Sequence, residues 1–294
     1  MADKAHILTD KKLEEMERRL AAIYASSESE LTDIAEEYFS AFEEADEKKR
    51  KQLDDGEITE EEYRTWRQQK FLRGELYKKM QEDVAKKLLA INALAVAYIN
   101  KQLPGIYAAN YNQLAVVLNH VVEYTFEITD ANTVRLLSNT NKSLLPYKKL
   151  DPTKDIPWNM KNINREVMQG IVNGESIPKI SKRMRNVQVM NREQSVRTAR
   201  TVVTGAENKG RMDSYEKAEE DGVVLQKKWI STSDSRTRHW HSELDGVVVD
   251  YDDPFVNEYG EIMYPGDPSA HPANVYNCRC TMAAVVTGFK KVRK

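Results

Sequence analysis

LLPYKKLDPTKDIPW (residues 144–158) is the stretch that divides this chain of 294 residues. Its three prolines, Pro146, Pro152 and Pro157, each lack the backbone N–H that the interior of a helix requires. Proline-rich segments of this kind mark boundaries between structural elements. Because the sequence changes character on either side of the stretch, we expect two domains, residues 1–150 and residues 151–294.

Residues 1–150 show the periodicity of amphipathic helices. Apolar side chains recur at steps of three and four residues in two stripes, Leu13, Met16, Leu20 and Ile23, then Leu31, Ile34, Tyr38 and Phe42. That spacing places each stripe on one face of a helix. The first domain is therefore predicted to be mainly helical.

A further helix is predicted to begin at Thr59. The Thr59 side chain can accept a hydrogen bond from the N–H of Glu62, whose side chain can reach back to the N–H of Thr59, which makes a capping box. The helix is expected to run to about Gln102 and to stop at Pro104. Roughly 40 residues at 1.5 Å each would span roughly 60 Å. A helix of that length suggests an arm or a scaffold that reaches a partner.

Residues 151–294 mix helices with strands. One helix is expected to end near Gly174, a second to open at Ser176, and a third to cover residues 191–221. Strands are predicted where β-branched and aromatic residues gather, at residues 222–232, 245–251 and 278–286. The fold class is therefore α+β, with long helices first and a small sheet in the C-terminal domain.

The composition indicates no partner by itself, because 44 basic and 46 acidic residues nearly cancel. The N-terminus is charged from its third residue and contains no apolar segment typical of a secretory signal. The longest apolar run, residues 88–99, is well short of the ~20 residues that a membrane-spanning helix needs. We expect a protein without a membrane span that is made in a reducing cytoplasm, where a structural disulfide is not expected.

Charges are segregated along the second domain. Residues 176–211 carry nine basic residues against two acids: Lys179, Lys182, Arg183, Arg185, Arg192, Arg197 and Arg200, followed by Lys209 and Arg211. Residues 233–267 carry nine acids against two arginines. Two interpretations stay open. Each run is a solvated face, or the first seven basic residues contact DNA phosphates or an acidic partner protein.

One helix within the basic segment has two distinct faces. Its polar stripe has steps of three and four residues and consists of Arg197, Arg200, Thr204, Asn208 and Arg211. Such a stripe is normally the solvent-exposed side of a helix. The opposite face is small and weakly apolar, with Val196, Ala199, Val203, Ala206 and Gly210, and would let another backbone pack closely.

Five side chains that can bind metals gather near the C-terminus: His239, His241, His271, Cys278 and Cys280. In a strand the two cysteines would point to the same face. They could then give one ion two thiolates, while His241 and either His239 or His271 complete a tetrahedral zinc site. The C-x-C spacing is less typical of zinc than C-x2-C. The alternative is that both cysteines are small core residues and His241 is hydrogen-bonded locally.

Catalytic signatures are sparse. The sequence contains no H-E-x-x-H, G-x-S-x-G, Walker or G-x-G-x-x-G motif. Asp245 or Glu243 could serve as a base beside a metal at the histidines. A zinc-dependent hydrolase or nuclease is therefore the alternative to a non-enzymatic role.

Five segments in a fixed order resemble the phage Mu F-like minor head protein family. They are the helix VRTARTVVTGAENKGRMDSYEKA (196–218), the segment KWISTSDSRTRHWHSELDGVVV (228–249), the short DDPF (252–255), the loop YPGDPSAHP (264–272) and the terminal NCRC (277–280). The resemblance extends from about Trp158 to Val286. The positions that match the family motifs are Arg200, Asn208, Asp234, Arg236, Thr237, Arg238, His241, Asp245, Gly246, Pro265, Gly266, Asn277, Cys278, Arg279 and Cys280.

The resemblance implies a structural role in a tailed phage. Such proteins are minor components of the procapsid that associate with the portal oligomer, and they are implicated in head assembly and in DNA packaging or ejection. The implied partners are the portal, the major capsid or scaffold protein and packaged double-stranded DNA. The implied location is the host cytoplasm during assembly and then the interior of the procapsid and virion. Asp234, Arg236, Arg238, Asp245, Gly246, Asn277 and Arg279 are then expected to be structural residues.

Overall fold

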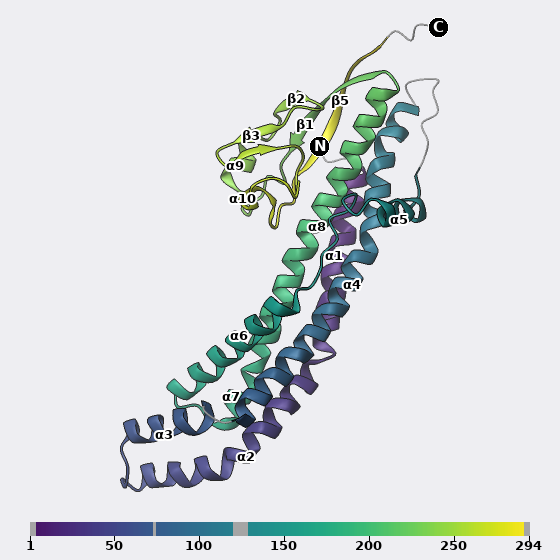
Figure 1. The fold of residues 1–294 in the computed structure, drawn as a ribbon. Helices are drawn as coiled ribbons and strands as arrows, with labels where there is room; N and C mark the ends of the chain where they lie inside the picture. Colours follow the sequence, from purple (N-terminus) through teal and green to yellow (C-terminus); the bar gives the residue numbers. More distant parts are fainter. Residues whose placement is uncertain (1–3, 73–74, 120–128, 291–294) are drawn as a thin grey trace. The chain divides into compact units, whose positions relative to one another are not determined.

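The computed structural model describes residues 4–72, 75–119 and 129–290 (Figure 1). By their contacts the residues divide into two compact units. Unit 1 comprises Met1–Arg18, Ala97–Lys148 and Val196–Lys294, and unit 2 comprises Arg19–Val96 and Lys149–Ser195. Three helices contribute residues to both units, namely α1 (Lys4–Ala25), α4 (Glu75–Asn119) and α8 (Met184–Glu220). The division into domains 1–150 and 151–294 stays a prediction.

The described secondary-structure elements of unit 2 are all helices. Besides its parts of α1, α4 and α8 it contains α2 (Glu28–Asp54), α3 (Glu60–Leu72), α6 (Pro152–Val172) and α7 (Ile177–Lys182). The predicted capping box is present at the start of α3. The N–H of Thr59 donates to Oε2 of Glu62 at 2.8 Å, and the N–H of Glu62 donates to Oγ1 of Thr59 at 3.2 Å. These bonds satisfy two donors that a helix start otherwise leaves unpaired.

A chain of amide and hydroxyl groups runs through unit 2. The hydroxyl of Tyr24 donates to Asn92 at 2.5 Å, Asn92 donates to Asn191 at 2.8 Å, and Asn191 donates to Asn159 at 2.9 Å. The four residues lie on α1, α4, α8 and α6. Burial raises the pKa of Tyr24 to about 12, so its hydroxyl stays protonated as a donor. These buried and part-buried polar groups bond one another and so join α1, α4, α6 and α8 within unit 2.

Helix α4 extends beyond the end of the predicted helix. The helices α3 and α4 cover most of the expected helix from Thr59 to Gln102, with residues 73–74 outside the described residues, and α4 continues through Pro104 to Asn119. The predicted stop at Pro104 was wrong. Leu103, Ile106 and Tyr107 beside the proline are all buried, and the burial of these apolar side chains offsets the lost backbone hydrogen bond.

Unit 1 contains the predicted small sheet. Its antiparallel strands have the order β2-β1-β5, and a separate hairpin pairs two short strands. The strands are β1 (Val223–Ile230), β2 (Val248–Asp250) and β5 (Thr281–Phe289), with β3 (Phe255–Asn257) and β4 (Gly260–Ile262) in the hairpin. Short helices α5 (Ala131–Thr140), α9 (His239–Ser242) and α10 (Pro272–Val275) complete the unit. The prediction of an α+β fold is confirmed.

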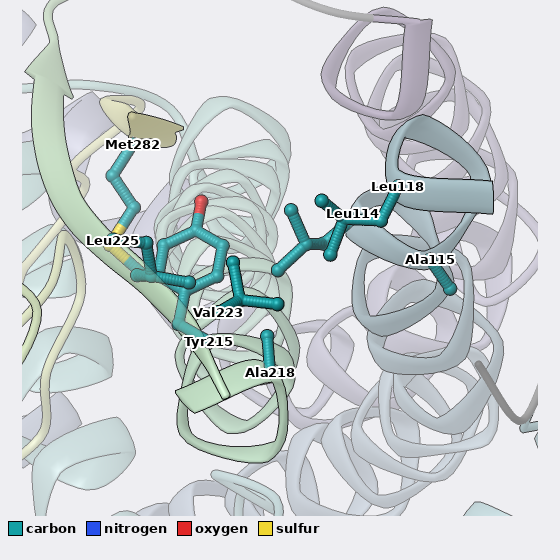
Figure 2. Close-up of a cluster of buried hydrophobic side chains, with 8 residues drawn as sticks. All are labelled: Leu114, Ala115, Leu118, Tyr215, Ala218, Val223, Leu225 and Met282. Atoms are coloured by element: carbon teal, nitrogen blue, oxygen red, sulfur yellow. The ribbon is translucent and has the colours of Figure 1, made fainter. Parts of the chain in front are cut away.

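One core of unit 1 lies between the sheet and two long helices. Figure 2 shows Val223 and Leu225 of β1 and Met282 of β5 gathered with Tyr215 and Ala218 of α8, next to Leu114, Ala115 and Leu118 of α4. A second core lies at the other end of β1 and consists of Trp229, Leu244, Phe255, Ile262, Cys278 and Cys280. The two cysteines thus belong to a buried apolar cluster.

The small face of α8 allows the predicted close approach. A Cβ atom at Gly210 would lie 2.5 Å from the backbone oxygen of Tyr107 on α4. Beside this contact, the hydroxyl of Tyr107 donates to Asp213 at 2.5 Å. Glycine at position 210 is therefore required for the packing of α8 on α4 in unit 1.

Among the described residues, no helix is both long enough and apolar enough to cross a bilayer.

Candidate metal centre

The polar stripe of α8 holds the NCRC loop (residues 277–280) by its backbone. Oγ1 of Thr204 donates to the carbonyl of Cys278 at 2.6 Å, and Nδ2 of Asn208 donates to the carbonyl of Cys280 at 3.2 Å. Oδ1 of Asn208 also accepts the N–H of Met282 at 3.1 Å. Both α8 side chains are buried, so the expectation that this stripe faces solvent was wrong for them. A buried loop must find partners for its backbone, and these side chains supply them.

One turn along α8, buried charges connect the helix to β5 and to α1. Nδ1 of His6 lies 2.7 Å from Oε1 of Glu207, and the hydroxyl of Thr281 donates to the same oxygen at 2.8 Å. Arg211 donates to Oδ1 of Asn110 on α4 at 2.9 Å. Sequence reasoning did not identify Glu207, His6, Asn110 or Thr281 as important. The available signal was a charged pair four residues apart, Glu207 and Arg211, beside small residues.

Asn277 turns the chain from α10 into the NCRC loop. Its backbone φ is +58°, a left-handed conformation that asparagine tolerates better than most residues do. Its N–H donates to the hydroxyl of Thr201 on α8 at 2.8 Å. The asparagine of the motif is thus needed for the direction of the loop.

Asp234 and Arg279 join the segment before α9 to the NCRC loop. The guanidinium of Arg279 donates to both carboxylate oxygens of Asp234, each at 2.7 Å. Asp234 also accepts the N–H of Arg236 at 3.0 Å, and Arg238 donates to the carbonyl of Tyr276. The hydrogen bonds from Arg279, followed by that N–H bond, hold the pKa of Asp234 well below its usual range. A two-pronged pair of this kind fixes the orientation of both segments.

Asp245 and Gly246 close the turn after α9. Oδ1 of Asp245 accepts the N–H of Ser231 at 2.8 Å, while the hydroxyl of Ser231 donates to the carbonyl of His241 at 2.5 Å. Gly246 has a φ of +82° and donates its N–H to Trp229 at 3.0 Å. These bonds hold α9 against the end of β1.

These contacts bring His241, Cys278 and Cys280 together. Nδ1 of His241 lies 3.7 Å from Sγ of Cys278 and 3.6 Å from Sγ of Cys280. The three donor atoms all lie within 4.8 Å of one another, and the residues are 1%, 2% and 3% exposed. The cysteines precede β5 instead of lying in it, so the predicted strand placement was wrong, although both sulfurs do face one histidine nitrogen. Residues 278–280 stay outside the sheet because their carbonyls are bonded by α8 and Thr232.

The two thiols differ in acidity. A hydrogen bond from Cys278 lowers the pKa of Cys280, and His241 adds to this effect against the opposing effect of burial. The same shared hydrogen bond and burial raise the pKa of Cys278 above its ordinary value. Of the two thiols, Cys280 is therefore the one that loses its proton more readily.

His239 and His271 do not join this cluster, so neither supplies the fourth ligand that the sequence suggested. The side chain of His239 is 79% exposed and lies 3.4 Å from Glu243. Positions 239 and 241 are two apart on a helix, so their side chains point in different directions. Nδ1 of His271 accepts the N–H of Ala273 at 3.2 Å and caps α10.

The carboxylates considered as bases are engaged elsewhere. Glu243 is exposed beside His239, and Asp245 bonds the backbone of Ser231. Within the described residues, the cluster that could hold a metal includes no carboxylate. No observation favours the hydrolase or nuclease alternative.

Comparison with known protein families gives a match to the segment that builds this site. Residues 161–283 match the family model of the Phage Mu protein F like protein. The matched segment contains Thr204 and Asn208 of α8, the short helix α9 and the NCRC loop. Residues 161–283 are thus similar to this family, and we call this segment the phage Mu F-like domain.

Three relatives share parts of the chain. Minor head protein GP7 of Bacillus phage SPP1 is 27% identical over 192 residues, which is 65% of this chain and 62% of that protein. The uncharacterized protein YqbB of Bacillus subtilis (strain 168) is 26% identical over 168 residues, 56% of this chain and 52% of that protein.

The NAD(+)--arginine ADP-ribosyltransferase EFV of Enterococcus faecalis (strain ATCC 700802 / V583) is 32% identical over 129 residues, 44% of this chain. Those residues are 26% of that enzyme. The chain thus spans between about a quarter and two thirds of the length of these relatives. No solved structure matches the chain.

The seven basic residues predicted to contact DNA or a partner protein fall into two groups. Arg183 pairs with Glu175 at 2.5 Å, Arg200 pairs with Glu17 at 2.7 Å, and Arg185 pairs with Glu28. The other group has no ion pair among the described residues and consists of Lys179, Lys182, Arg192 and Arg197. Lys179 and Lys182 lie in unit 2 and Arg197 in unit 1, and all three are exposed.

Proposed function

We propose that this chain is a non-enzymatic minor head protein of a tailed phage, which associates with the portal during head assembly and remains inside the procapsid and virion. The observation that carries the proposal is the match of residues 161–283 to the phage Mu F-like family. The 27% identity to a protein named as a minor head protein, over 65% of this chain, supports it.

The geometry of the family motif is consistent with a structural role. Asp234 is engaged by Arg279, and Thr204 and Asn208 bond the backbone of the NCRC loop. The polar groups of these side chains are hydrogen-bonded to one another and to the backbone. They hold the domain together, as a structural role requires.

The experiment is co-assembly with the other head proteins of the same phage. We expect the full chain to co-sediment with a portal oligomer and to be present in purified procapsids, with the major capsid and scaffold proteins present. Omission of the portal gene should remove the chain from the procapsids. Absence of the chain from heads, or incorporation that does not depend on the portal, would overturn the portal assignment.

The exposed basic residues support an additional contact with packaged double-stranded DNA. Each lysine or arginine that neutralises a phosphate releases counterions, so binding weakens as salt rises. Lys179 and Lys182 are the strongest candidates because they are exposed and have no ion pair among the described residues.

The DNA contact is tested by the paired replacement Lys179→Glu and Lys182→Glu. We expect weaker binding to a duplex at low salt. The plot of log affinity against log salt should become shallower, with the magnitude of its slope smaller by about 2. Lys142→Glu with Lys149→Glu is the matched control, since both lysines are exposed and lie outside residues 176–211. Equal losses in the two pairs, or binding of the parent chain that does not respond to salt, would reject this contact.

A further inference from the structure

We propose that the phage Mu F-like domain of this chain binds one zinc ion through Nδ1 of His241 and the Sγ atoms of Cys278 and Cys280, and that this ion secures α9 to the NCRC loop. The inference goes beyond the proposed function, because it concerns the domain by itself and needs neither portal nor DNA.

The donor distances are those of ligands around one tetrahedral ion. Zinc lies about 2.3 Å from a cysteine sulfur and about 2.0–2.1 Å from a histidine nitrogen, so neighbouring nitrogen and sulfur ligands are about 3.5–3.6 Å apart. The two nitrogen–sulfur distances here are 3.6 and 3.7 Å. Both nitrogen–sulfur distances therefore fit a shared zinc ion.

Hydrogen bonding alone accounts less well for the same arrangement. A neutral imidazole nitrogen has one lone pair and accepts one hydrogen bond. Both sulfurs nevertheless lie at nearly equal distances from Nδ1 of His241. A thiol is also a weak donor. One cation shared by the three atoms satisfies all of them at once.

Hydrogen-bond donors and one positive charge lie near the sulfurs. The backbone N–H of Cys280 donates to Sγ of Cys278 at 3.4 Å, and the backbone of Thr232 donates toward Cys280. Arg238 places a positive charge near Cys278. Thiolates are the form in which cysteine binds zinc, and two thiolates with a neutral imidazole make an uncharged site suited to burial.

The ligands come from two segments that are 37 and 39 residues apart in sequence. Each segment is already held in place, one by Ser231 and the other by Thr204 and Asn208. An ion between them would close the loop from α9 to the start of β5. With three protein ligands among the described residues, we assign the fourth position to a water molecule. A water ligand is typical of catalytic zinc, but no carboxylate that could act as a base accompanies the three ligands among the described residues, so the ion is assigned a structural role.

The first test measures zinc in the full chain, purified without a tag from cells supplied with zinc. We expect about one zinc per chain in the parent protein and less than about 0.1 in Cys280→Ser, because a two-ligand site holds the ion poorly. His239→Ala is the matched control, since this exposed histidine lies two residues from His241 and should retain the full content. A metal-free parent protein whose melting temperature does not respond to added zinc would overturn the proposal.

A second measurement applies if Cys280→Ser does not fold. Reaction of the parent protein with a thiol-specific dye is followed with and without a chelator. We expect the chelator to speed labelling of both cysteines at least tenfold and added zinc to reverse the effect. Equal labelling rates in the two conditions would overturn the proposal. Because both tests use the isolated chain, failure of zinc binding and failure of portal association are distinguishable.

Discussion

The carboxylate of Glu207 on α8 contacts side chains from both α1 and β5. It is buried, lies 2.7 Å from His6 and accepts the hydroxyl of Thr281. Burial would lower the pKa of His6, but the hydrogen bond and the charge of Glu207 together raise it above 6.5. The folded protein therefore binds the His6 proton more tightly than the unfolded chain does.

This difference predicts a pH-dependent role for His6. A raised pKa contributes stability that is complete below about pH 6.5 and is lost as the pH rises through the folded-state pKa. We expect His6→Gln to lower the free energy of unfolding by about 1–3 kcal/mol at pH 6, and by less as the pH increases toward 9. Urea unfolding of both proteins across this range measures the difference. His239→Gln is the control, since the exposed ring should show no such trend, and a loss in His6→Gln that is constant with pH would contradict the assignment.

At the scale of elements, α8 is the helix that organises unit 1. Its small face meets α4, and its polar face bonds the NCRC loop and β5. Two opposite faces of one helix are therefore both buried. The sequence of α8 does not reveal that both faces are buried, because about half of its buried side chains are polar.

Two glycine replacements test the helix contact with opposite expected signs. Gly210→Ala should destabilise the protein by roughly 1–3 kcal/mol, because the new Cβ would lie 2.5 Å from the backbone oxygen of Tyr107. Gly105→Ala should stabilise α4 by roughly 0.5–1 kcal/mol, because nothing lies within 4 Å of its new Cβ and alanine favours the helix. Thermal and urea unfolding give both values. Similar effects at the two positions would show that α8 and α4 are not in close contact.

At the scale of the whole chain, both units are assembled from separated segments. Unit 1 combines Met1–Arg18 and Ala97–Lys148 with Val196–Lys294. The side chains of Leu114 and Leu118 on α4 cover the core formed by Val223 and Leu225. The C-terminal half therefore relies on the N-terminal half for part of its core.

This arrangement predicts that a fragment of residues 151–294 is unstable by itself. Without α4 it exposes Val223 and Leu225 and leaves Arg211 without the amide of Asn110. We expect broad thermal unfolding by circular dichroism and binding of a hydrophobic dye, whereas the full chain should unfold cooperatively. Cooperative unfolding of the fragment would instead support the family domain that the sequence places at 151–294.

Local patterns could be read from the sequence with good accuracy. The capping box at Thr59, the helix start at Ser176 and the strand at Val223–Ile230 depend on neighbouring residues, and all three are present. The motif residues likewise indicated the family. Pro104 was misread because its effect on α4 depends on buried neighbours that local sequence does not reveal.

The candidate site was only half predictable for the same reason. Cysteine and histidine types pointed to a metal-binding set, but five candidates could not be reduced to His241, Cys278 and Cys280 without their positions. Thr204 and Asn208 resembled an exposed polar stripe until the loop they bind was in place.

The sequence by itself indicated most of the helices, the α+β class and the similarity to the phage Mu F-like family. These features depend on periodicity and on residues near one another in the chain. The tertiary structure decided which polar residues are buried, which histidine faces the cysteines and that α4 passes through its proline. Burial and pairing between distant segments arise only when the chain packs, since a polar side chain is stable inside a protein only where a particular partner meets it.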